Sequence, residues 1–256
     1  MQRIDMLLVE RSLASSRTHA QRLIKDGRVR AQAGADWQAI TKPGLKLPCD
    51  TPLEVEADPQ DRFVSRGALK LQGALAHSGL DVTGMVALDV GQSTGGFTDC
   101  LLQAGAALVV GVEVGHDQLA PQLRQDPRVV CYEGMNARDL PAETLLPHSP
   151  DGGGFDLAVM DVSFISQTKI LPSLAPLIRP GGRLISLVKP QFEVGPGGIG
   201  KGGIVRDSRL YEQVEVEVSG CCKGLGLRVE NYLASPIKGG DGNTEFLLLA
   251  VKNDDR

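Results

Sequence analysis

The chain has 256 residues, 42% hydrophobic and 23% charged, a globular composition that argues against disorder. It contains no apolar run near the roughly 18 residues of a spanning helix, and charges interrupt the short apolar run at its N-terminus, so we expect neither a membrane span nor a secretory signal. The five cysteines lie on segments that look buried and show no C-x-x-C pairing, which argues against a metal site or a disulfide framework and favours a reducing cytoplasm.

The net charge of -4 conceals two parts of opposite charge. Residues 1–48 carry nine Lys and Arg against four Asp and Glu, whereas residues 49–256 carry eighteen against twenty-seven. The basic residues are densest between 11 and 30, which suits a polyanion such as RNA, although a solvated helical face is the alternative. The candidate RNA-binding residues are Arg11, Arg17, Arg22, Lys25, Arg28 and Arg30.

The first 58 residues are expected to form a small α/β domain. Apolar residues at helical spacing predict helices over 3–13 and 16–26, and short strands are expected around Val29 and over 53–55. Residues 31–40, AQAGADWQAI, are predicted to be a loop. Trp37 in this loop could stack on a base or cover the small core.

The segment RIDMLLVERSLASSRTHAQRLIKDGRV, with KPG at 42–44 and a final LEV, resembles the RNA-binding domain of ribosomal protein S4. The resemblance implies an RNA-binding module over 1–58, which a polar linker over 59–66 joins to the rest. The sequence departs from that family at 31–40, where a tighter turn is usual.

From residue 67 onward, predicted strands and helices alternate. Residues 208–223 fit either a strand or a helix, and their length and the following Gly224 favour a helix. The last two segments, 227–233 and 245–251, are expected to pair antiparallel at a sheet edge. The remaining strands are expected over 86–90, 108–112, 129–132, 157–160 and 183–188, with helices over 96–104 and 170–177. The alternation predicts a doubly wound, Rossmann-like parallel sheet over 67–256.

A glycine-rich turn, LDVGQSTGGFTD at 88–99, is expected between a strand and a helix. Glu113 closes the following strand, where a carboxylate can accept hydrogen bonds from both ribose hydroxyls of a nucleoside. The spacing does not fit the G-x-G-x-x-G of nicotinamide sites, and each feature alone is a common structural device. The turn resembles the S-adenosylmethionine loop of class I methyltransferases, which implies a cofactor site at Asp89, Gly91, Ser93, Thr94, Gly95, Gly96, Glu113 and Asn136.

A second glycine-rich segment, GPGGIGK at 195–201, nearly spells a phosphate loop. Gly202 stands where that motif needs a hydroxyl for magnesium, which disfavours nucleotide hydrolysis. Its many glycines favour a flexible lid.

Four dispersed segments carry the remaining chemistry: SRGALKL at 65–71, VMDVSFIS at 159–166, SLVKPQFE at 186–193 and GNTEFLL at 242–248. Their Lys70, Asp161, Lys189 and Glu245 match the catalytic tetrad of FtsJ-type ribose methyltransferases. Over essentially its whole length the chain resembles the TlyA family of ribosomal RNA 2′-O-ribose methyltransferases. The resemblance implies S-adenosylmethionine as cofactor, ribosomal RNA or ribosomal subunits as partner, and a cytidine ribose as target. Gln92 and Ala68 depart from the family, and Gln92 could alter cofactor affinity.

The positions of these residues support the same grouping. Asp161 and Lys189 end predicted strands and Glu245 opens another, so they are expected at the ligand-binding edge of the sheet. A ribose 2′-hydroxyl is a poor nucleophile that must be oriented and relieved of its proton. Lys189 could serve as the base or only orient the hydroxyl, and a set of surface ion pairs is the bland alternative.

Two other functions stay open at this point. One is a membrane-acting hemolysin, a name attached to this family, which the absence of a spanning segment or a long basic amphipathic helix disfavours. The other is a non-catalytic RNA-binding assembly factor, which the intact tetrad disfavours.

Overall fold

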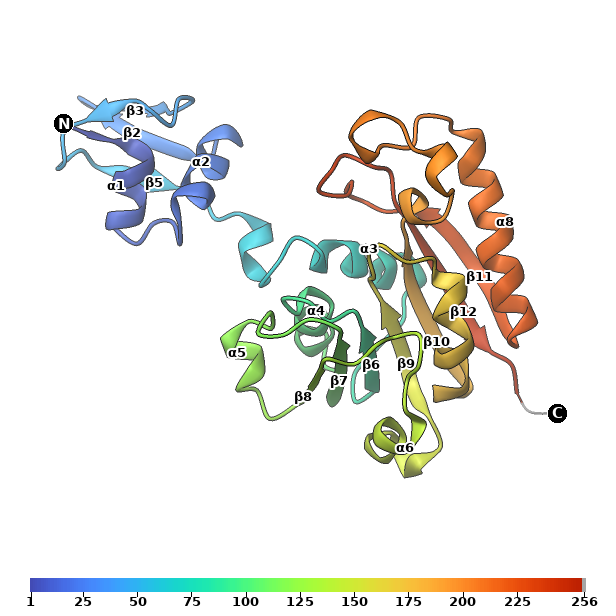
Figure 1. Cartoon of the computed structure of the whole chain (residues 1–256). Coiled ribbons are helices and arrows are strands. Elements are labelled where there is room, and N and C mark those ends of the chain that lie inside the picture. Colours follow the sequence, from blue (N-terminus) through green and yellow to red (C-terminus); the bar gives the residue numbers. More distant parts are fainter. Residues whose placement is uncertain (255–256) are drawn as a thin grey trace. The chain divides into compact units, whose positions relative to one another are not determined.

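The computed structural model describes residues 1–254, apart from the side chains of 59 and 60, and it divides the chain into two compact units. The first unit is Met1–Arg62 and the second begins at Phe63 (Figure 1). Each unit has its own hydrophobic core.

The first unit packs two helices against small antiparallel sheets. The hydroxyl of Ser16 caps the second helix by accepting a hydrogen bond from the backbone N–H of His19. Ile4, Leu8, Leu23 and Ile24 form the centre of the core. The elements are β1 (Gln2–Arg3), α1 (Ile4–Glu10), α2 (Arg17–Lys25), β2 (Val29–Ala33), β3 (Asp36–Ala39), β4 (Lys46–Leu47) and β5 (Leu53–Val55).

The predicted loop over 31–40 is wrong. These residues form a hairpin in which β2 pairs with β3, because Gly34 takes a φ of 66° that closes the turn. Trp37 lies on β3 and is 44% exposed, so it does not cover the core. A short polar turn between two strands is easily mistaken for an extended loop.

The second unit is a seven-stranded sheet in the order β11-β12-β10-β9-β6-β7-β8, with helices on both faces (Figure 1). All strands are parallel except β12, which runs antiparallel to both of its neighbours. The doubly wound fold is therefore confirmed. The strands are β6 (Val86–Val90), β7 (Leu108–Glu113), β8 (Val129–Glu133), β9 (Phe155–Met160), β10 (Ile178–Val188), β11 (Leu227–Ala234) and β12 (Phe246–Lys252).

The helices divide between the two faces of this sheet. Leu71, Leu101 and Leu123 bring one set into the core on one face, and Leu145 and Leu174 belong to the core on the other. The first set is α3 (Ala68–Ser78), α4 (Gly96–Gln103) and α5 (Pro121–Arg124), and the second is α6 (Ala142–Leu145), α7 (Leu171–Leu174) and α8 (Arg209–Gly224).

The structure settles the ambiguity over 208–223 in favour of a helix. Val214 and Val218 are buried while Val216 is 74% exposed, which is the pattern of one helical face and not of alternating strand residues. The predicted helix over 170–177 is broken, since α7 spans only four residues and a 3-10 turn follows over 175–177. Pro172 and Pro176 lack the N–H groups that a continuous helix requires.

The two C-terminal strands pair antiparallel as predicted, but only β11 lies at the edge. β12 inserts between β11 and β10, with Phe246 opposite Val188. Because β12 runs antiparallel to the other strands, its first residue lies at the same end of the sheet as the carboxyl ends of β6, β7, β9 and β10. Residues just before β12 thus join the loops that follow the parallel strands.

The cysteines are all free in the structure. Cys49 is exposed, which corrects the expectation that every cysteine lies on a buried segment. Within residues 1–254, no helix is both long and apolar enough to cross a bilayer.

Candidate active site

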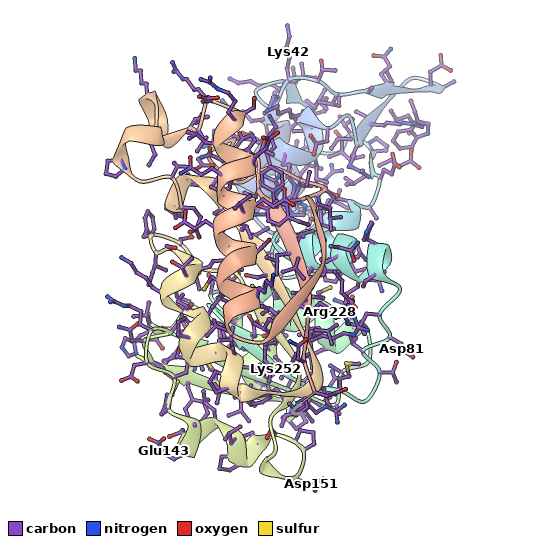
Figure 2. All side chains as sticks on the ribbon, turned by 90° about the vertical axis from the view of Figure 1, so that its right-hand side faces the viewer. Lys42, Asp81, Glu143, Asp151, Arg228 and Lys252 are labelled. Carbon is purple, nitrogen blue, oxygen red and sulfur yellow. The ribbon has the colours of Figure 1, made fainter. Side chains whose placement is uncertain are left out.

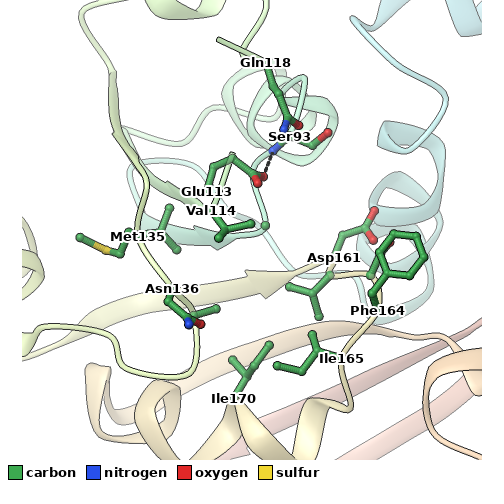
Figure 3. Close-up of a pocket in the computed structure, with 15 residues that line it drawn as sticks. Ser93, Glu113, Val114, Gln118, Met135, Asn136, Asp161, Phe164, Ile165 and Ile170 are labelled. Atoms are coloured by element: carbon green, nitrogen blue, oxygen red, sulfur yellow. Dashed lines mark hydrogen bonds between the residues drawn. The ribbon is translucent and has the colours of Figure 1, made fainter. Parts of the chain in front are cut away.

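A cavity of about 470 Å³ opens at the carboxyl edge of the sheet (Figure 3). The loops after β6, β7, β8 and β9 surround it, bringing Ser93, Glu113, Asn136 and Asp161 to one space. Its apolar lining comes from Val112, Val114, Met135, Ile165 and Ile170. The mixture of an apolar wall and a few converging polar groups is typical of a small-molecule site.

Glu113 fastens the glycine-rich turn to the end of β7. Its carboxylate accepts hydrogen bonds from the backbone N–H of Ser93 at 2.8 Å and of Gly115 at 3.0 Å, and the first is drawn in Figure 3. Ser93 takes a φ of 50° there. Each carboxylate oxygen has a second acceptor position, so Glu113 can still accept hydrogen bonds from a ligand in the cavity.

The glycines of the turn are required because it packs tightly. A side chain at Gly91, whose φ is 82°, would collide with the backbone carbonyl of Asp161. Gly95 lies against Leu119 and Leu123, so it packs the turn on its neighbours. Thr94 and Gly96 line a smaller adjoining cavity that Asp161 shares.

Beneath the turn lies a buried polar chain. The Thr98 hydroxyl donates to Asp89 at 2.6 Å, and the Gln92 amide donates to the Thr98 hydroxyl oxygen at 2.9 Å. Burial raises the pKa of Asp89 to about 7, and the charges of Asp161 and Glu113 add to this effect. Asp89 is fully buried, so it supports the turn from behind.

Gln92, the departure from the family pattern, points into this buried chain. Its amide lies over the Cα of Gly111 in the middle of β7, where a methyl group would overlap it. Gln92 is 3% exposed. The larger residue at 92 is thus accommodated by a glycine on the neighbouring strand.

The four tetrad residues come together as two ion pairs. Lys70, in the first turn of α3, contacts Glu245 with Nζ 2.5 Å from Oε2. Lys189 contacts Asp161 with Nζ 2.6 Å from Oδ1. The side chain of Glu245 is only 3% exposed, whereas that of Asp161 is 23% exposed and lines the cavity. The carboxylate of the first pair is therefore enclosed, and that of the second faces the ligand space.

Sequence reasoning missed the partners that hold these pairs. The ammonium of Lys189 also donates to the hydroxyl of Ser163 at 3.0 Å, and the amide of Gln191 donates to Glu245 at 3.3 Å. Both lie within the sequence segments that carry the tetrad, but hydroxyls and amides are too common to be singled out without coordinates.

A second connection joins the loops after β9 and β10. Glu193 accepts hydrogen bonds from the Ser166 hydroxyl at 2.6 Å and the Gln167 backbone N–H at 2.9 Å, and burial raises its pKa. Phe164 is 90% exposed and takes a φ of 65°, and the centroid of its ring is 5.0 Å from that of Phe192. These contacts fix the loops that carry Asp161 and Lys189.

Most of the predicted RNA-binding residues have partners inside the first unit. Arg17 contacts the buried Asp5, whose pKa is held well below its ordinary value chiefly by Arg3. Arg11 donates to backbone carbonyls at 49 and 51, Arg22 pairs with Asp61, and Arg28 donates to the carbonyl of residue 57. Lys25 and Arg30 are exposed and form no ion pair within residues 1–254.

No group of three or more His, Cys, Asp and Glu residues in the described part of the chain is arranged to hold a metal ion. The polar groups at the sheet edge are instead paired with one another, lysine against carboxylate.

Comparisons with known proteins agree with this geometry. Residues 63–252 match the FtsJ-like methyltransferase family, and residues 2–31 match the S4 domain. The chain is 43% identical over 254 residues to the 16S/23S rRNA (cytidine-2′-O)-methyltransferase TlyA of Mycobacterium tuberculosis, covering 99% of this chain and 91% of the relative.

Two further relatives carry a different name. Hemolysin A of Brachyspira hyodysenteriae is 38% identical over 245 residues, which cover 96% of this chain and 98% of the relative. A solved structure from Streptococcus thermophilus, described as a candidate hemolysin, is 42% identical with a TM-score of 0.74, covering 99% of this chain and 89% of that one.

The contact between Gln92 and Gly111 predicts a coupled pair of substitutions. Gly111→Ala is expected to lower the free energy of unfolding by about 1–3 kcal/mol, the range for overpacking a core. In a Gln92→Ser background the same substitution should cost less than about 0.5 kcal/mol, because the overlapping amide is gone. Urea unfolding of the four proteins in this cycle measures the coupling, and additive losses would contradict it.

Burial of Asp89 predicts a pH-dependent stability. Its pKa of about 7 lies above the ordinary value of 3.8, so the folded state holds more protons between about pH 4 and pH 7. This group's contribution therefore falls as pH rises through that window, by up to about 1.4 kcal/mol per pH unit. Asp89→Asn should remove this pH-dependent loss of stability. The free energy of unfolding of the variant should therefore rise relative to that of wild type as pH approaches neutrality. Parallel curves of unfolding free energy against pH would refute this.

Proposed function

The chain belongs to the FtsJ-like methyltransferase family, and we propose that it methylates ribosomal RNA at the 2′-hydroxyl of a cytidine ribose. The observation that carries the proposal is the convergence of Lys70, Asp161, Lys189 and Glu245 beside a cavity of nucleoside size. The near full-length likeness to a cytidine-2′-O-methyltransferase supplies the substrate class.

The cofactor is S-adenosylmethionine, and the cavity fits it. About 470 Å³ lies within the range of pockets that take ligands of this size. We assign the ribose hydroxyls to Glu113, and the adenine to Asn136 and the apolar side chains around Met135. Ser93 and Thr94 border the part of the site nearest Asp161. When bound, the cofactor supplies an electrophilic methyl group on a sulfonium centre.

The protein's own contribution is to hold and orient the hydroxyl. Lys189, fixed by Asp161 and Ser163, is a hydrogen-bond donor in this arrangement. The ammonium can therefore orient a 2′-oxygen so that its lone pair faces the methyl group. To act as a base instead, Lys189 would first have to lose a proton and, with it, the ion pair to Asp161. The ion pair thus favours orientation over general-base catalysis.

Lys70 and Glu245 support this geometry from within the protein. Gln191 joins Glu245 to the turn that begins at Lys189, so the internal ion pair and the exposed one form a connected set. Losing one partner of a buried ion pair leaves an unpaired charge, which is strongly unfavourable.

The first unit is the second part of the proposal. It matches the S4 domain, and we assign its role as holding ribosomal RNA through exposed Lys25 and Arg30, with Arg11, Arg17, Arg22 and Arg28 shaping the surface. Action on ribosomes places the chain in the cytoplasm. The alternatives are a membrane-acting role and a purely structural role in assembly. A methyl-transfer assay with unmodified ribosomal RNA distinguishes both from the proposed methyltransferase function.

Replacing Lys189 tests the catalytic assignment. Lys189→Ala should lower the single-turnover rate on unmodified ribosomal RNA by on the order of 10²–10⁴-fold, because the orienting group acts in the transition state. Affinity for S-adenosylmethionine should stay within a few-fold of wild type. Lys223→Ala, an exposed lysine at the far end of α8, is the matched control.

A Lys189 variant within a few-fold of the wild-type rate would refute the tetrad's role. A wild-type rate that does not change with pH would reject only the base role and leave orientation in place.

Charge substitutions in the first unit test its role in binding. Lys25→Gln and Arg30→Gln should each weaken RNA binding and reduce the slope of log affinity against log salt by roughly 1, since each removes one phosphate contact. Glu54 lies beside Arg30 in the strand register, so Glu54→Gln should act in the opposite direction. Fluorescence anisotropy at several salt concentrations measures these effects, and unchanged slopes would remove this role from the first unit.

A further inference from the structure

The glycine-rich segment that resembles a phosphate loop has no part in the site described above. Residues 195–206, GPGGIGKGGIVR, contain two basic residues and no acidic one. It forms two 3-10 turns, Pro196–Gly198 and Lys201–Gly203, and an antiparallel bridge between Ile199 and Val205 closes the second turn. The segment therefore has a defined local structure that a nucleotide-binding role does not explain.

A single buried side chain fastens this segment to the turn before β12. Asn243, 1% exposed, accepts a hydrogen bond from the Val205 backbone N–H at 3.0 Å. Its amide group donates to the Gly203 carbonyl at 3.0 Å and to Asp241 at 2.8 Å. Asn243 thus uses its acceptor and its donor group to hold two separate loops together.

The fastened loops lie next to the tetrad. Asn243 is two residues before Glu245, and the carbonyl of Glu245 accepts from the backbone N–H of Ser235 at 2.9 Å. Gly239 lies so close to Glu245 that an added Cβ would be 2.5 Å from its carboxylate oxygen. The residues flanking these positions therefore border the catalytic edge of the sheet.

Three exposed cations project from these loops: Lys201, Arg206 and Lys238. None of them forms an ion pair within residues 1–254. Of the acidic groups nearest in sequence, Asp207 pairs with Arg209, and Asp241 accepts a hydrogen bond from the neutral amide of Asn243.

At the opposite end of the sheet most arginines are paired, although the exposed Lys223 there forms no ion pair among the described residues. Arg179 pairs with Asp156, and Arg183 and Arg228 pair with Glu230. Figure 2 shows Arg228 and Lys252 at the end of α8 away from the glycine-rich segment. The second unit carries 17 Lys and Arg against 22 Asp and Glu over 63–256. The feature that is particular to the tetrad's end is therefore the presence of three such cations on adjoining loops of an acidic unit.

We propose that Lys201, Arg206 and Lys238 form a second RNA-binding surface, which contacts the sugar-phosphate backbone on either side of the target nucleotide. The inference deepens the proposed function and rests on it. Glycines on this segment leave the backbone open to close approach, with no atoms within 4 Å of the Cβ positions at Gly197, Gly202 and Gly203. When cationic side chains neutralise phosphates, the counterions condensed on the nucleic acid are released, which favours binding of a strand.

The test uses the full-length chain with single Gln substitutions at the three positions and the triple variant. The KM for unmodified ribosomal RNA should rise in each single variant by roughly 3- to 10-fold. The salt slope of binding should fall by roughly 2–3 in the triple variant, since roughly 0.7–0.9 is lost per phosphate contact. The rate at saturating RNA and the affinity for S-adenosylmethionine should stay within a few-fold, because none of the three cations contacts the tetrad. Lys223→Gln, at the opposite end of α8, should match wild type throughout.

Equal KM values and equal salt slopes in wild type and triple variant would overturn the proposal. A lower rate at saturating RNA with an unchanged KM would also overturn it, because the cations would then act on the reacting hydroxyl. So would loss of binding to phosphatidylglycerol vesicles with unchanged RNA binding, since the surface would then recognise lipid headgroups. A wild-type protein that binds RNA but transfers no methyl group refutes the proposed function, while its salt slope still tests this surface.

Discussion

The site depends on one constraint of the sheet, the direction of β12. Parallel strands place their carboxyl ends at a common edge, which brings Asp161 and Lys189 together after β9 and β10. If β12 were parallel as well, its first residues would lie at the opposite end of the sheet, away from Asp161 and Lys189. Because β12 is antiparallel, Glu245 starts at the shared edge, where it meets Lys70. The tetrad is thus a consequence of topology as much as of residue type.

Close packing of the glycine-rich turn sets the shape of the cofactor cavity. Gly91 lets the chain pass over the end of β9, and Gly111 leaves room for the buried amide of Gln92. Glu113 then ties the turn to β7 through the backbone of Ser93. A turn held from three sides presents its polar groups in a fixed arrangement, which lowers the entropic cost of binding a flexible ligand.

The two ion pairs of the tetrad differ in the exposure of their carboxylates, because the Glu245 side chain is 3% exposed and that of Asp161 is 23% exposed, while the two lysines are almost equally buried. Lys70 and Glu245 form an internal pair, while Asp161 and Ser163 line the cavity and both contact Lys189. Asp161 can be reached from the cavity, whereas Glu245 is enclosed in the protein, where Lys70 balances its charge. This difference agrees with the proposal that Lys189 and Asp161 act on the substrate and that Lys70 and Glu245 support them.

The sequence by itself determined the class of fold and the positions of most strands, because hydrophobic periodicity is a local property of the chain. The four residues proposed as the tetrad came from its resemblance to a known family. The sequence also placed Glu113 at the end of β7 and Gly91 in the turn. Only the tertiary structure decided that 31–40 is a hairpin, that β12 lies inside the sheet, and that Asp89 supports the turn from behind. The same holds for the pairing of each lysine with its carboxylate and for the fastening of the glycine-rich segment by Asn243. These features depend on contacts between residues distant in sequence, which no local pattern encodes.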